Sequence, residues 1–361
     1  MKKLIFLLAI LALPFLGMNL VGLSPFDVKA NVQVGTGIGA KLACSGRYLS
    51  GFDAQQVGAD IASYSAAADL LSISYEDTEQ SASASLLGFG MTKAKFRPGL
   101  GCTLEREGSE SLDRITVAKI QESLAPWPQG SMVASLKAST QSQLETLLQR
   151  DNSEGLQSRA LLIVREGEIV AEAYAQGISP QTPLMGWSMG KSLSAIMLGY
   201  LAQRERLTTE QANLFPQWAG DDRRNINLRQ LLQMSSGLDF SEVYAPGSDA
   251  TRMLFIAASA SDVAKASPLV HPPGSHFSYS SGTANLLSEI FVTQAGGTQA
   301  AVDVLRKHIL APMGMAHTTL ELDANGVFVG SSNIYSSTRD WARLGLLMLN
   351  KGQLNGHRII S

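Results

Sequence analysis

Cysteine and histidine, the residues that most often bind transition metals, are scarce in this chain of 361 residues. It has two cysteines and five histidines. Neither cysteine has a partner nearby at ligand spacing, and no pair of histidines has the spacing of a metal site on a helix. The "HPPGSH" segment at 271–276 is better explained as a turn, because two prolines separate its histidines. We therefore expect no metal site.

Charge of either sign is also limited. Charged residues make up 17% of the chain, and the formal net charge is −2. A protein that binds nucleic acid through its phosphates needs a large basic field, so this balance excludes that class of partner. Hydrophobic residues make up 45% of the sequence, which is enough for a substantial buried core.

One long apolar run stands at the start of the chain. It extends from Leu4 to Leu23, follows two lysines and is interrupted by Pro14 and two glycines. Residues 1–30 are therefore expected to be an export signal, with cleavage after Ala30, or a membrane anchor, since about 20 apolar residues can span a bilayer. In either case the rest of the chain is expected to be exported, in the periplasm or anchored to the outer side of the inner membrane.

The two cysteines, Cys44 and Cys102, both lie in the part that would follow the export signal. An oxidising compartment would allow them to pair, so we expect a structural disulfide. The alternative is a pair of buried free thiols.

The sequence after residue 30 divides into two parts. Residues 31–130 are rich in Ala, Ser and Gly and contain short β-leaning runs such as "LLSISYE", so they predict a small β-containing region that ends in a linker, "PWPQGS". The "GTGIGA" run at 35–40 follows no credible strand, so no dinucleotide site is expected there.

Residues 131–361 have firmer patterns. "RALLIVREGEIVAEAYA" (159–175) predicts a hairpin with a turn at Glu166-Gly167, and "LSAIMLGYLAQRERL" predicts a buried helix.

The segment "GWSMGKS" (186–192) places Ser188 three residues before Lys191 at the expected start of that helix. Residues i and i+3 share a helix face, so the lysine amine can reach the serine hydroxyl. The positive end of the helix dipole favours negative charge beside the serine, and apolar neighbours would make the amine a better base. The spacing alone is weak, because an N-cap serine and a surface lysine would give the same pattern.

Several ordered segments resemble the serine β-lactamase and penicillin-binding protein superfamily, in its class C-like, esterase and 6-aminohexanoate-dimer hydrolase branch. They are Ser188-x-x-Lys191, "LLQMSSGL", "HPPGSHFSYSS" with Tyr279, and "SSTRDWARLGLLMLNKGQLNGHRIIS". The resemblance begins near Ala160. It implies an α/β fold, an antiparallel sheet flanked by helices, with a mainly helical subdomain between about 200 and 330.

The resemblance also implies roles. Ser188 would be the acylated nucleophile, and Lys191 and Tyr279 would share its proton, with the choice of base left open. No metal or organic cofactor is implied. Tyr244 and Asp249 lie on the loop where members of this family line the substrate pocket.

Two features depart from the family pattern. Ser281 occupies the position of the asparagine that commonly binds the substrate's acylamide, which weakens a prediction of β-lactam hydrolysis. No K-T-G or H-x-G element follows Tyr279. Because that element supplies an oxyanion-hole donor, we expect residues 131–361 to be a domain truncated at its C-terminus, or a natural inactive form.

The sequence thus predicts an exported serine hydrolase that cleaves a small-molecule amide or ester through an acyl-enzyme on Ser188. One alternative is a non-catalytic relative that binds cell-wall peptide or a protein partner. A second alternative, among enzymes, is a D-alanyl peptidase or β-lactamase.

Overall fold

The computed structural model describes residues 25–64 and 66–361. The apolar run from Leu4 to Leu23 therefore lies outside the described residues. Residues 28–30, at the expected cleavage site, lie in the first helix that is described, α2 (Pro25–Cys44). Within 25–64 and 66–361, no helix combines the length and the apolar character that a membrane span requires.

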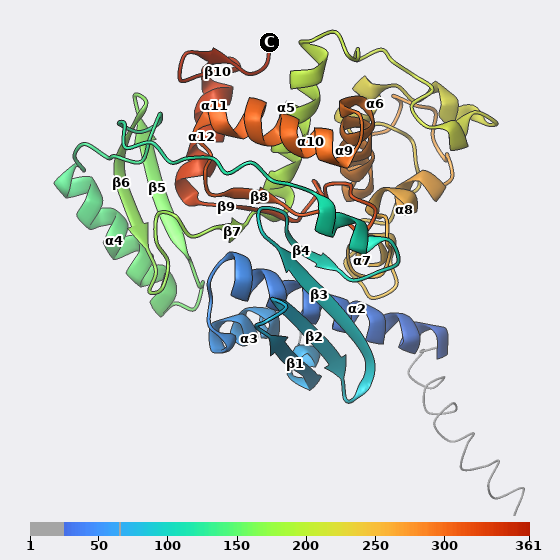
Figure 1. Cartoon of the computed structure of the whole chain (residues 1–361), viewed down its shortest axis with the longest axis horizontal. Helices are drawn as coiled ribbons and strands as arrows, with labels where there is room; N and C mark the ends of the chain where they lie inside the picture. Colours follow the sequence, from blue (N-terminus) through green and yellow to red (C-terminus); the bar gives the residue numbers. More distant parts are fainter. Residues whose placement is uncertain (1–24, 65) are drawn as a thin grey trace, which may run out of the picture.

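The N-terminal region packs helices against one antiparallel sheet of four strands in the order β1-β2-β3-β4 (Figure 1). Its elements are α2, the π-helix η1 (Ser45–Leu49), α3 (Ala54–Ala62), the 3₁₀ helix η2 (Ala66–Leu70), β1 (Leu71–Glu76), β2 (Ser81–Leu86), β3 (Phe89–Arg97), β4 (Gly101–Leu104) and the 3₁₀ helix η3 (Ser109–Arg114).

Helix α2 is not among the elements expected from the sequence, because glycines and β-branched residues disfavour helices. Tertiary contacts account for it. A Cβ at Gly37 would lie 2.5 Å from the carbonyl oxygen of Phe255, and a Cβ at Gly39 would lie 2.9 Å from the Cβ of Ala84. Both glycines therefore permit close approach, one to Phe255 of α7 (Asp249–Phe255) and one to β2 of the small sheet. The "GTGIGA" run is thus a packing surface within a helix.

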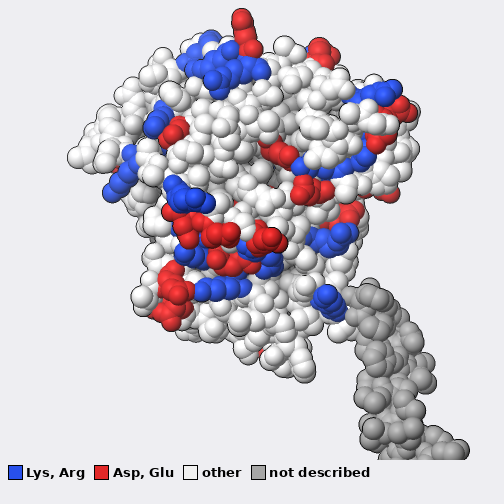
Figure 2. Space-filling model, turned by 45° about the vertical axis from the view of Figure 1, so that its right-hand side comes forward, with Lys and Arg blue, Asp and Glu red and all other residues white. Residues whose placement is uncertain are grey.

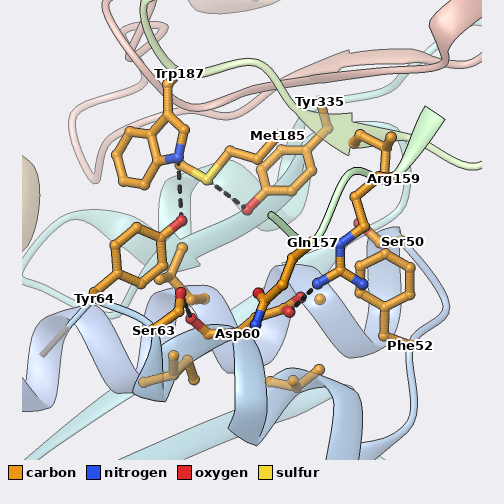
Figure 3. A pocket seen from close by; sticks show the side chains of 15 residues that line it. Ser50, Phe52, Asp60, Ser63, Tyr64, Gln157, Arg159, Met185, Trp187 and Tyr335 are labelled. Atoms are coloured by element: carbon orange, nitrogen blue, oxygen red, sulfur yellow. Dashed lines mark hydrogen bonds and ion pairs between the residues drawn. The ribbon is translucent and has the colours of Figure 1, made fainter. Parts of the chain in front are cut away.

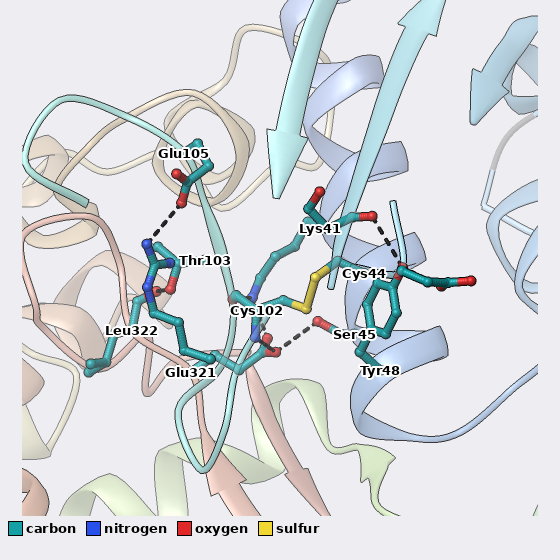
Figure 4. Close-up of a disulfide and its surroundings, with 12 residues drawn as sticks. Lys41, Cys44, Ser45, Tyr48, Cys102, Thr103, Glu105, Glu321 and Leu322 are labelled. Carbon is teal, nitrogen blue, oxygen red and sulfur yellow. Dashed lines mark hydrogen bonds and ion pairs between the residues drawn. A yellow bond between two sulfur atoms is a disulfide. The ribbon is translucent and has the colours of Figure 1, made fainter. Parts of the chain in front are cut away.

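A buried ion pair beside the disulfide joins the N-terminal region to the rest of the chain (Figure 4). The Cys44–Cys102 disulfide confirms the expected pairing. Glu321, which follows β8 (Thr318–Leu320), pairs with Lys41 and accepts hydrogen bonds from the Ser45 hydroxyl and the Cys102 N–H, each at 2.7 Å. Burial lowers the pKa of Lys41 in spite of the adjacent carboxylate. The disulfide therefore ties α2 to β4, and Glu321 holds both on the second part of the chain.

Lys41 and Glu321 are 2% and 0% exposed, so Glu321→Ala is expected to leave the buried Lys41 amine without its carboxylate partner. The free energy of unfolding, measured by urea denaturation, should fall by about 3–5 kcal/mol. The matched control is Glu79→Ala, which removes an exposed partner of Lys93 and should cost less than about 1 kcal/mol.

The double change Lys41→Met and Glu321→Leu should recover much of that loss, since an apolar pair can replace a buried ion pair at little cost. If Glu321→Ala unfolds at the same urea concentration as the parent protein, the buried pair does not hold the two parts together.

The second part of the chain holds the remaining helices and three further antiparallel sheets. Its strands are β5 (Ala160–Arg165), β6 (Glu168–Tyr174), β7 (Leu184–Met185), β8 (Thr318–Leu320), β9 (Ile334–Ser336), β10 (Gln353–Leu354) and β11 (His357–Arg358). Its α-helices are α4 (Ala138–Ser153), α5 (Gly190–Ala202), α6 (Leu228–Leu232), α7 (Asp249–Phe255), α8 (Ala260–Ala266), α9 (Ser281–Ala295), α10 (Thr298–Val304), α11 (Ala311–Met313) and α12 (Thr338–Leu349). Short helices η4 (Trp187–Met189), η5 (Pro216–Trp218), η6 (Asp222–Asn225) and η7 (Leu305–Leu310) complete it.

The predicted hairpin at 159–175 is confirmed as β5–β6. Its turn residues Glu166 and Gly167 both have positive φ, 55° and 84°, as a tight hairpin turn requires. Helix α4 covers one face of the hairpin through Leu144 and Leu148. The antiparallel pairing agrees with the expected fold class, but it is divided among separate sheets, with β7-β9-β8 forming the one beside the serine helix.

The helical subdomain is confirmed between α6 and α11, and its core is built on α5 and α9. Leu193 and Met197 of α5 and Leu286 and Phe291 of α9 are fully buried. Figure 1 shows β7, β8 and β9 between these helices and the N-terminal region. The start of α5 therefore lies where the two parts of the molecule meet.

The expected linker at 126–131 is bound to α12 by hydrogen bonds. The Arg343 guanidinium, in α12, donates hydrogen bonds to the carbonyl oxygens of Pro128 and Gly130 at 2.8 and 2.6 Å, and it pairs with Asp340 at 2.7 Å. On the face in Figure 2, acidic and basic side chains lie close to one another among wide uncharged areas, so neither sign dominates that face.

Candidate active site

Ser188 lies in the 3₁₀ turn η4, and Lys191 follows in the first turn of α5. The Lys191 Nζ donates a hydrogen bond to the Ser188 Oγ at 3.0 Å. The structure therefore brings the two residues together as their helical spacing indicated. Both side chains lie at the N-terminal end of α5, where the helix dipole favours negative charge.

The Lys191 amine has two further hydrogen-bond acceptors. It donates to the Ser281 Oγ at 3.0 Å and to the backbone carbonyl oxygen of Ser331 at 3.1 Å. These partners come from α9 and from the segment before β9. Together with Ser188, they hold the Lys191 amine in position from three distant parts of the sequence. The Ser331 carbonyl has no signal in the sequence, because any residue could supply it.

Tyr279, in the segment just before α9, also lies against the lysine. The Lys191 Nζ is 4.8 Å from the centroid of the Tyr279 ring, within the range of a cation–π contact. Among the hydrogen bonds of the described residues, none joins the Tyr279 hydroxyl to Ser188 or Lys191. The side chain is 43% exposed, so the hydroxyl can meet a ligand from solvent.

Ser281 is fully buried, and its hydroxyl is held on both sides. It accepts from Lys191 and donates to the Glu242 Oε1 at 2.5 Å, while the Ser281 N–H donates to the Glu242 Oε2 at 2.7 Å. Ser281 was expected at a substrate-binding position, whereas the structure buries its hydroxyl between Lys191 and Glu242. Ser281 instead connects the lysine to a carboxylate.

Glu242 is the site residue that sequence reasoning missed. It lies in "SEVYAPGSD", two residues before Tyr244, and nothing in that segment marks it apart from its charge. Its Oε1 also accepts a hydrogen bond from the Tyr244 hydroxyl at 3.1 Å. Burial raises the pKa of Tyr244, so this phenol remains a donor at neutral pH.

Of the two candidates on this loop, only Tyr244 reaches the site. Its hydroxyl is 3.5 Å from the Ser281 Oγ, and 53% of the side chain is exposed. Asp249 begins α7, where its carboxylate accepts from the Ser241 N–H at 3.0 Å and pairs with Arg252 at 3.5 Å. Asp249 thus closes the loop that carries Glu242 and Tyr244.

The backbone around Ser188 is tightly constrained. Trp187 has a φ of 45°, an uncommon conformation for an aromatic residue that strained functional sites often hold. A Cβ at Gly190 would lie 2.6 Å from the Ile334 Cδ1 and 2.9 Å from the Gly330 carbonyl oxygen. The glycine of "SMGKS" therefore lets α5 lie directly against β9 and the segment that supplies the Ser331 carbonyl.

Trp187 and Tyr64 form a partition beside the serine. The Trp187 Nε1 donates to the Tyr64 hydroxyl at 3.2 Å, and the ring centroids are 5.8 Å apart (Figure 3). One side of this pair faces a pocket of about 210 Å³, which has polar and apolar walls and contains the Asp60–Arg159 ion pair. The other side faces an apolar cavity of about 450 Å³, which Tyr244 also lines.

Comparison with known proteins finds relatives named as hydrolases. A 6-aminohexanoate-dimer hydrolase from Paenarthrobacter ureafaciens is 25% identical over 215 residues, which cover 56% of this chain and 54% of that protein. The chain thus matches about half the length of this curated relative.

Two solved structures show the same fold. A Bacillus anthracis protein assigned as a 6-aminohexanoate-dimer hydrolase has a TM-score of 0.55 at 19% identity and covers 70% of each chain. A Bacteroides dorei protein assigned as a β-lactamase has a TM-score of 0.51 at 20% identity, over 61% of this chain and 66% of the other.

The model of the Beta-lactamase family matches residues 142–361, which include Ser188, Lys191 and Tyr279. That match leaves α2, α3 and the sheet β1–β4 outside it. Because it covers more than half of the sequence, the chain belongs to the β-lactamase family.

Proposed function

We propose that the protein is a serine hydrolase that cleaves an ester or amide through an acyl-enzyme on Ser188. The observation that carries the proposal is the 3.0 Å hydrogen bond between the Lys191 Nζ and the Ser188 Oγ, at the start of a buried helix. A nucleophile within hydrogen-bond reach of a base that other residues orient is the usual arrangement of covalent catalysis.

Activation of Ser188 requires an amine that can accept its proton. The hydrogen bonds offer a path, because Lys191 donates to Ser281 and Ser281 donates to Glu242. When one proton moves along each bond, Lys191 becomes a neutral amine, Ser281 is regenerated and Glu242 becomes a carboxylic acid. The amine then takes the Ser188 proton as the Oγ attacks the substrate carbonyl carbon.

The attack places negative charge on the carbonyl oxygen, which we position against the Ser188 N–H at the N-terminal end of α5. Collapse of the tetrahedral intermediate breaks the bond to the leaving group. Lys191 returns the proton to that alcohol or amine, directly or through the exposed hydroxyl of Tyr279. Water then attacks the acyl-enzyme by the same route and frees the acid.

In this scheme Glu242 is a positioning residue, because it acts through Ser281 on Lys191. Glu242→Gln is expected to lower the maximal rate of ester hydrolysis by roughly 100-fold, the lower end of the range for a lost acid–base contribution.

The kcat for ester hydrolysis, measured for both proteins, tests this prediction. Glu154→Gln, on the exposed end of α4, is the matched control and should leave kcat unchanged. A Glu242→Gln protein with the parent's kcat would remove the carboxylate from the mechanism.

The substrate class follows from the site and its relatives. Both relatives named as 6-aminohexanoate-dimer hydrolases favour an amide or ester over a β-lactam. Ser281 gives the same preference, because this buried serine offers no side-chain amide to bind the acylamide group of a β-lactam. We also propose that the protein acts outside the inner membrane, on the strength of the lysines and apolar run at its N-terminus.

Stopped-flow hydrolysis of p-nitrophenyl acetate and butyrate tests the proposal. We expect a burst of nitrophenolate stoichiometric with enzyme and then slower turnover, because acylation precedes deacylation. An absence of burst and turnover would favour a non-catalytic binding protein. A covalent adduct with fluorescent penicillin would favour a D-alanyl peptidase or β-lactamase, whereas ester turnover without that adduct would exclude both.

A further inference from the structure

We propose that the apolar cavity beside Trp187 binds the hydrocarbon chain of the substrate's acyl group, so that the enzyme prefers esters of medium-chain fatty acids. This inference rests on the proposed function, and it names the substrate class of the same site. The cavity has a volume of about 450 Å³, within the range of small-molecule sites.

The lining of the cavity is suited to hydrocarbon. Among the described residues that form it, none is charged, and apolar side chains such as Val34, Ile38, Leu71 and Phe255 predominate. The smaller pocket on the other side of Trp187 holds a carboxylate and a guanidinium, Asp60 and Arg159. An apolar chain in the cavity gains free energy by burying apolar surface without desolvating those two charges.

Two side chains of the cavity wall adjoin the proposed catalytic residues. Trp187, the residue before the nucleophile, is one wall. Tyr244 is another, and its hydroxyl contacts both Glu242 and Ser281. The cavity therefore lies next to the residues that surround Ser188.

The far wall comes from the N-terminal region, outside the part of the chain that matches the β-lactamase family. Helix α2 contributes Asn31, Val34, Gly35, Ile38 and Leu42. The disulfide ties this helix to β4, and the buried Lys41–Glu321 pair holds it on the second part of the chain. The preference for a hydrocarbon acyl group is thus a property that the N-terminal region adds to the family's site.

Gly35 offers a direct test, because a Cβ built on it meets no atom within 4 Å although the residue lines the cavity. Gly35→Leu should fill the cavity without disturbing the helix. With the parent protein, kcat/KM for p-nitrophenyl esters should rise by about fourfold for each methylene that the cavity buries, and at least about tenfold from butyrate to octanoate. Gly35→Leu should lower the ratio of the octanoate to the acetate value by about tenfold or more.

The matched control is Gly58→Leu. Gly58 lies in α3, also has no atom within 4 Å of a built Cβ, and lines neither pocket, so this variant should keep the parent's ratio and its turnover of acetate. Ser188-dependent turnover of acetate, with equal kcat/KM for all chain lengths, would overturn the acyl cavity while leaving the hydrolase proposal intact. A preference for long alcohols in acetate esters, in place of long acids, would also overturn it.

A binding measurement keeps the inference testable if no ester is hydrolysed. Titration with 11-(dansylamino)undecanoic acid should give saturable energy transfer from tryptophan, since Trp187 forms the cavity wall. Gly35→Leu should raise the dissociation constant by about tenfold, and Gly58→Leu should not change it. Absence of saturable binding to the parent protein would refute the cavity's role whatever the protein's activity.

Discussion

Ser188→Ala will remove the nitrophenolate burst and lower the steady-state turnover of p-nitrophenyl butyrate by roughly a thousandfold or more. The hydroxyl forms the covalent bond to the acyl group, and no other group can substitute for it in that step. The residual rate should be that of water attacking substrate held beside the helix terminus. Stopped-flow absorbance measures both the burst and the steady state.

Ser192→Ala is the matched control, because it makes the same change one turn further along α5 on an exposed residue. It should leave the burst and the rate unchanged. A Ser188→Ala protein that retains a stoichiometric burst would show that a different nucleophile carries the reaction.

Lys191→Met will lower kcat/KM by a comparable factor, about 10³-fold. Among the described residues, the Lys191 amine is the only basic group that donates a hydrogen bond to the Ser188 Oγ. The thioether of methionine has a similar length, but it can neither accept the serine proton nor return it. The Ser188→Ala, Lys191→Met double variant should be no slower than Ser188→Ala alone, because the two residues act as a unit.

Lys119→Met, on an exposed loop, is the control for loss of a lysine charge and should behave as the parent protein. Circular dichroism of Lys191→Met should match the parent, since Lys191 is only partly buried. A loss of less than about tenfold would transfer the role of base to Tyr279, whose contact with the lysine is through its ring.

Local patterns in the sequence predicted the parts of this site that depend on short-range geometry. The i, i+3 spacing of Ser188 and Lys191 is set by the helix itself, so their contact followed once the helix was recognised. The turn at Glu166-Gly167 and the pairing of the only two cysteines followed from equally local reasoning.

Contacts between distant segments could not be predicted in this way. Glu242 reaches Ser281 across 39 residues, and Lys41 reaches Glu321 across 280, and neither acid has a distinctive neighbourhood in the sequence. Helix α2 forms against its local propensity, because Gly37 allows it to pack against Phe255. The same packing makes α2 a wall of the apolar cavity, which no motif indicated.

The most direct test of the central claim is the mass and rate of adduct formation with a fluorophosphonate probe. We predict a single phosphonyl adduct on the peptide that contains Ser188, absent in Ser188→Ala and formed at least about a hundredfold more slowly in Lys191→Met. An adduct on any other serine, or equal labelling rates for the parent and Lys191→Met proteins, would contradict the account.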